Sequence, residues 1–79
     1  MTEKQALRQM VLSFKWRMRA RMAVSLPWPT IREEMMNLLE CKVDQWLNDV
    51  EHANPATFTV LESHIKAKME RFMAGVKIV

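Results

Sequence analysis

The chain has 79 residues, 49% of them apolar, and its 12 lysines and arginines against 9 acidic residues give a net charge of +3. This length suits one small domain, and so modest a charge does not by itself indicate a nucleic-acid-binding protein. The single cysteine, Cys41, excludes an internal disulfide and favours a reducing compartment.

The sequence also lacks the usual signs of membrane insertion or secretion. No apolar run approaches the ~20 residues of a membrane span, and charges from Glu3 onward interrupt any secretory signal. We therefore expect a soluble, cytoplasmic protein with one complete domain, residues 1–79. A domain of this size buries only about 60% of its unfolded surface, yet the apolar content exceeds what three short helices need for one core. The surplus predicts a dimer or a protein partner.

The first predicted helix covers residues 3–24. Thr2 and Gln5 have the spacing of a capping box, which satisfies free backbone N–H groups at a helix start. The helix ends before residues 25–30, where two prolines disfavour helical geometry. Its predicted core stripe is Leu7, Val11, Phe14, Met18 and Met22.

Two further helices are predicted, over residues 31–53 and 55–74. Thr30 with Glu33 suggests a capping box for the second helix, and Asn54 with Pro55 suggests a cap and first turn for the third. A competing start for the third helix is Thr59 with Glu62. Gly75 is the expected stop. The core stripes are Met36, Leu39, Val43, Trp46 and Val50, then Phe58, Leu61, Ile65, Met69, Phe72 and Val76.

Three amphipathic helices predict an all-α fold. We expect a three-helix bundle, or a helical hairpin plus a third helix, completed by oligomerisation or by a partner. An antiparallel hairpin of the first two helices would bring Lys4 level with Glu51 and Lys15 level with Glu40. The basic ridge of the first helix (Lys4, Arg8, Lys15 and Arg19) would then face the acidic ridge of the second (Glu33, Glu40 and Glu51).

A second apolar strip lies opposite the core stripe of the first helix: Leu12, Trp16, Ala20 and Ala23. One explanation is that the first helix is central in the bundle, or that the third helix or Ile78 and Val79 of the tail cover this strip. The other is that the strip docks another protein with Trp16 as an aromatic anchor. Ile31, Met35 and Leu38 extend the apolar surface towards the turn that carries Trp28. The predicted partner-binding residues are Leu12, Trp16, Ala20, Ala23, Arg17, Arg21 and Trp28.

The remaining cations have two open interpretations. Arg17 and Arg21 lie on the flank of the first helix away from the predicted ion pairs, and Lys66, Lys68 and Arg71 of the third helix could join them. Together they could bind an anionic partner such as nucleic acid. A solvated face is the simpler explanation of the third-helix cations.

No residue pattern predicts catalysis or a cofactor. His52 and His64 lie on different helices without the paired spacing of a metal site, and Cys41 has no identifiable base nearby. We therefore predict no enzyme activity, no metal and no cofactor. The predicted function is a protein-binding adaptor or regulator that acts through the apolar, arginine-flanked face of the first helix. The alternative is a nucleic-acid-binding helical module, and a third possibility is a first helix that lies on an anionic membrane surface.

Overall fold

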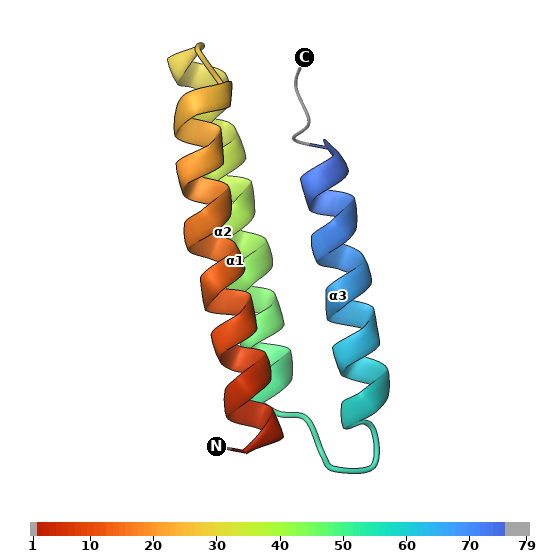
Figure 1. Cartoon of the computed structure of the whole chain (residues 1–79). Helices are drawn as coiled ribbons and strands as arrows, with labels where there is room; N and C mark the ends of the chain where they lie inside the picture. The colour runs from red at the N-terminus through yellow and green to blue at the C-terminus, as the bar shows by residue number, and fades with distance from the viewer. Residues whose placement is uncertain (1, 76–79) are drawn as a thin grey trace.

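The computed structural model describes residues 2–75, which form three α-helices joined by two short connections (Figure 1). α1 covers Glu3–Ser25, α2 covers Pro29–Glu51 and α3 covers Phe58–Gly75. The first two form an antiparallel hairpin, and α3 returns beside it, so that the molecule is a rod of 43 × 18 × 16 Å. The predicted all-α fold is confirmed. Val76, the last residue of the predicted third stripe, and the tail residues Ile78 and Val79 lie outside the described residues.

α1 begins with the capping box that the sequence predicts. The Gln5 N–H donates to Thr2 Oγ1 at 3.2 Å, and the Thr2 N–H donates to Gln5 Oε1 at 3.0 Å. At the other end, the Leu26 N–H donates to the Met22 carbonyl at 3.0 Å, which closes the last turn. The helix therefore has both ends satisfied by its own neighbours.

α2 begins two residues earlier than predicted, and Thr30 does not cap it. Its N-cap is Trp28, which makes no side-chain capping bond, and Pro29 occupies the first turn. A proline there has no N–H to satisfy and a φ angle already suited to a helix, so the helix can start without a capping side chain. The prediction treated Pro29 only as a helix breaker, and this was wrong.

α3 begins at Phe58, between the two predicted starts and at neither. Asn54 holds a turn instead of starting the helix: its Oδ1 accepts the Thr57 N–H at 3.1 Å. The first bond that continues into α3 runs from the Leu61 N–H to the Thr57 carbonyl at 3.0 Å. The asparagine side chain thus competes with the helix for the N–H groups of this segment, as its short amide often does.

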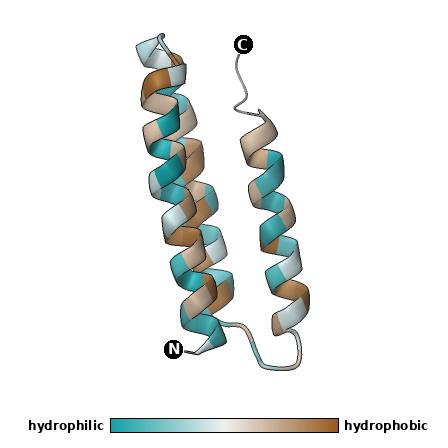
Figure 2. Cartoon of the chain, viewed as in Figure 1, coloured by the Kyte–Doolittle hydropathy of each residue, from teal (hydrophilic) through white to brown (hydrophobic). Residues whose placement is uncertain are grey.

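The core lies where the predicted stripes meet. All five stripe residues of α1 are buried, and so are Leu39, Val43, Trp46 and Val50 of α2 and Phe58, Ile65 and Met69 of α3. Met36, Leu61 and Phe72 are half-buried against this core. Hydrophobic and hydrophilic segments alternate along every helix in Figure 2, as expected of amphipathic helices.

Phe14 of α1 joins the three helices. Its ring centroid lies 5.9 Å from that of Trp46 in α2 and 6.2 Å from that of Phe72 in α3, both in edge-to-face geometry. α1 and α2 approach each other closely, whereas α3 approaches both of them less closely. The structure is therefore a tight hairpin to which α3 is attached chiefly through a few large side chains.

The ion pair between α1 and α2 differs from the predicted one. Glu40 binds Arg19, at an N···O distance of 2.8 Å, and not Lys15. Arg19 lies one turn further along the same ridge, and its forked guanidinium suits a carboxylate better than an ammonium does. Lys4 does reach Glu51, but its Nζ donates to the backbone carbonyl at 2.6 Å and not to the carboxylate.

We expect Arg19→Glu to destabilise the hairpin and Glu40→Arg to rescue part of the loss. The coupling should be only ~0.2–1 kcal/mol, because exposed ion pairs are weak, and these side chains are 38% and 47% exposed. A double-mutant cycle followed by urea unfolding measures it, and added salt should reduce it. In the control cycle, Lys15→Glu with Glu40→Arg should be additive. Equal coupling in the two cycles would show that Glu40 does not select Arg19.

Candidate docking surface

The strip formed by Leu12, Trp16, Ala20 and Ala23, called the outer strip below, lies on the face of α1 that points away from the core. Trp16 is 62% exposed. Ala20 and Ala23 are also exposed, and Leu12 is half-buried. α2 and α3 pack against the opposite face of α1, so the expectation that α3 covers the strip is wrong. The alternative cover, Ile78 and Val79, lies outside the described residues.

Two cations accompany the Trp16 ring. Lys15 Nζ and Arg19 Cζ each lie 5.5 Å from the ring centroid, within cation–π range. Arg19 is held in turn by Glu40 of α2. The indole is therefore linked through Arg19 to the neighbouring helix, which limits its freedom before any partner arrives.

The other flank of the outer strip is also basic. Arg17 and Arg21 are exposed, and neither forms a salt bridge with any of residues 2–75. No residue of α1 other than Glu3 is acidic. The outer strip thus runs between two rows of positively charged residues. One of these residues, Arg19, is already paired with Glu40.

The turn between α1 and α2 adds further exposed apolar side chains. Trp28 is 58% exposed there, and Val24 and Ile31 on either side of it are exposed as well. Val24 was missed in the sequence, although it follows Ala20 at the spacing of four that links Leu12, Trp16 and Ala20. Lys15 and Arg19 belong to a basic ridge predicted to flank the outer strip. Neither was counted among the partner-binding residues, although one adjoins Trp16 and the other follows it by three residues.

Five methionines of α1 and α2 pack in or against the core. Met18 and Met22 are buried, and Met10, Met35 and Met36 are half-buried against the core. They act as core filler, the ordinary use of a flexible thioether side chain.

The cations of α3 do not form one surface with Arg17 and Arg21. Lys66 is paired with Glu62 at 3.1 Å and lines a groove towards α1. Lys68 and Arg71 line a different groove, towards Lys42 of α2. The basic residues that could serve a nucleic acid are therefore divided between separate faces.

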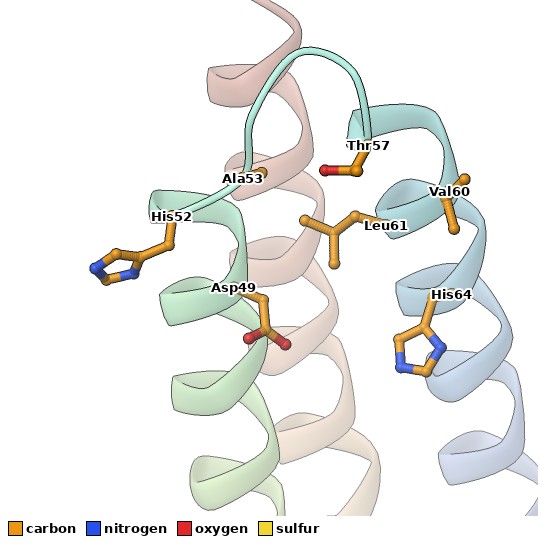
Figure 3. Close-up of a pocket in the computed structure, with 7 residues that line it drawn as sticks. All are labelled: Asp49, His52, Ala53, Thr57, Val60, Leu61 and His64. Carbon is orange, nitrogen blue, oxygen red and sulfur yellow. The ribbon is translucent and has the colours of Figure 1, made fainter.

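A groove of 420 Å³ lies between the end of α2 and the start of α3 (Figure 3). The side chains of Asp49 and His64 face each other across it, whereas His52 points away, with its Nδ1 2.9 Å from the Asn48 carbonyl. Among residues 2–75, no three histidine, cysteine, aspartate or glutamate side chains lie close enough together to hold a metal ion. The groove therefore offers too few ligands for a metal centre.

Comparison with known proteins finds no match: no protein-family model, no characterised protein and no solved structure resembles the chain significantly. No helix within residues 2–75 has the length and apolarity needed to cross a bilayer.

Proposed function

We propose that the chain is a small adaptor or regulator that binds another protein through the outer strip of α1. The observation that carries this proposal is the 62% exposure of Trp16 on a helix whose core face is already filled. Exposing an indole to water is unfavourable, and a tryptophan ringed by arginines is the typical composition of a binding hot spot. The lone thiol of Cys41, which is exposed, suits a reducing compartment, and we propose the cytoplasm.

The positive charges on both sides of the outer strip indicate the chemistry of the partner surface. Basic residues lie on both sides of the outer strip: Lys15 and Arg19 on one side, Arg17 and Arg21 on the other. They would repel another basic surface, including the same strip of a second copy of the chain. A partner surface with an apolar centre and acidic residues at its rim would pair with both flanks. The predicted dimer therefore requires a surface other than strip against strip.

Ala20 and Ala23 favour a protein over a lipid surface. Small side chains let a partner helix approach the backbone of α1 closely, whereas they add little apolar area for insertion into a membrane. Trp16 then supplies the anchor and the alanines supply the space beside it. Leu12 extends the contact by one further turn.

We expect Trp16→Ala to abolish association while leaving the helical content intact. Truncation of a hot-spot anchor typically costs more than about 2 kcal/mol of binding free energy. Circular dichroism measures the helical content, and affinity capture from the expressing cells with parent and variant side by side measures association with the partner. Val60→Ala, at an exposed apolar position of α3, is the matched control and should change neither.

Two results would contradict protein docking. Binding to a DNA duplex or single strand that falls steeply with salt and is lost in Arg17→Ala with Arg21→Ala would favour the nucleic-acid alternative. Binding to vesicles that contain anionic phospholipid, with a blue shift in tryptophan fluorescence that Trp16→Ala removes, would favour a membrane surface.

A further inference from the structure

The groove that Lys68 and Arg71 line towards Lys42 has a volume of 240 Å³ and lies between α2 and the carboxyl-terminal half of α3. Three cations line it: Lys42 from α2, and Lys68 and Arg71 from α3. Its apolar lining comes from Phe72, which is half-buried against the core, and from Trp46, a core residue that is 4% exposed. The groove therefore combines aromatic walls with a concentration of positive charge.

None of these three cations has a partner among residues 2–75. They form neither a salt bridge nor a side-chain hydrogen bond there, whereas Lys66 pairs with Glu62 and Arg19 with Glu40. The sequence gives them no acidic neighbour at a spacing of three or four residues. Lys68 and Arg71 are themselves three residues apart, a spacing at which like charges repel on a helix.

The dipole of α3 accounts for only part of this arrangement. It favours cations such as Arg71 near the carboxyl terminus of the helix. It does not explain why Lys42, in the middle of α2, lines the same groove. Bringing a third positive charge to the pair on α3 opposes the packing of α3 against α2, so an anion at this point would relieve the repulsion and tighten the contact.

We propose that this groove binds a small aryl anion, meaning a carboxylate or phosphate carried on one aromatic ring. The three cations would hold the anionic group through charge-assisted hydrogen bonds, and Arg71 offers the forked geometry that suits these oxygens. The ring would pack chiefly against Phe72, because only a small part of Trp46 is accessible. A volume of 240 Å³ lies below the roughly 300–1,000 Å³ of sites for drug-sized ligands, so a one-ring compound fits better than a larger one.

The test uses the full chain and three probes: phenyl phosphate, inorganic phosphate and phenol. Amide NMR titrations give the affinities and show which residues respond. Phenyl phosphate should bind about tenfold more tightly than either fragment, because it alone uses both the cations and the rings. Its shifts should map to α2 and α3 around Lys42, Lys68 and Arg71. Equal affinity for phenyl phosphate and inorganic phosphate, or shifts centred on α1, would overturn the proposal.

The variants separate this groove from general attraction to a basic protein. Lys68→Gln with Arg71→Gln should weaken phenyl phosphate binding about tenfold, whereas Lys66→Gln, which removes a cation already paired with Glu62, should change it little. Circular dichroism checks that each variant is folded. An equal loss in both variants, or the same affinity in the double variant as in the parent, would contradict the proposal. The outer strip of α1 is not involved, so neither outcome bears on protein docking.

Discussion

Replacing Trp46 with alanine should lower the free energy of unfolding by about 3–5 kcal/mol, whereas the same change at Trp16 should leave it almost unchanged. Trp46 is 4% exposed and packs edge-to-face on Phe14, so its loss removes a large apolar area and leaves a cavity. Trp16 contacts chiefly water and two cations, which contribute roughly 0.5–1 kcal/mol at an exposed site. Alanine, a better helix former than tryptophan, offsets part of that.

Chemical denaturation of the two variants beside the parent measures this difference. A chain of this length has a total stability of about 4–12 kcal/mol at typical values per residue, so the loss expected for Trp46→Ala is a large fraction of it. A large loss of stability in Trp16→Ala would mean that its indole is part of the core, and the outer strip would then lose its standing as a docking surface.

Phe14→Ala should be about as damaging, at roughly 3–5 kcal/mol, because Phe14 is buried and its ring meets one aromatic side chain from each of the other two helices. Phe72→Ala removes only the contact with α3. We expect a smaller loss of global stability, together with local opening of α3. Amide exchange should become fast throughout α3 while the α1–α2 hairpin stays protected.

Native-state hydrogen exchange on both variants distinguishes these outcomes. Met73→Ala, at an exposed position one residue further along α3, is the control and should leave the exchange of α3 unchanged. Uniform loss of protection in all three helices of Phe72→Ala would contradict the structure of a tight hairpin with a more weakly attached α3.

The core could be predicted because helical periodicity depends only on spacing. Every predicted core residue of α1 is buried, and within residues 2–75 only Met36, Leu61 and Phe72 fall short of full burial in the other helices. Leu26, which is buried in the turn, was missed because it lies beyond the predicted end of the first helix, although it follows Met22 by four residues. Its carbonyl accepts a bond from Arg32 Nε at 2.9 Å, a tertiary contact that no local pattern encodes.

Helix starts and ion pairs were harder to predict, because several residues compete for each role. Pro29 starts α2 without a cap, and Asn54 uses its side chain in a turn instead of capping α3. Glu40 had two cations within reach on one ridge, and spacing alone could not rank Arg19 above Lys15. The position of the outer strip on α1 followed from periodicity, but its exposure depended on where α3 packs, which the sequence left open.

The most direct test of protein docking is site-specific photocrosslinking in the cells that express the chain. A benzoylphenylalanine at position 13, an exposed serine three residues before Trp16, leaves Trp16 and both alanines in place, and the same group at position 60 is the control on α3. The proposal predicts a discrete protein adduct from position 13 that is absent from position 60 and disappears when Trp16→Ala is added. Adducts of equal yield from both positions, or an adduct from position 13 that is nucleic acid or lipid, would contradict it.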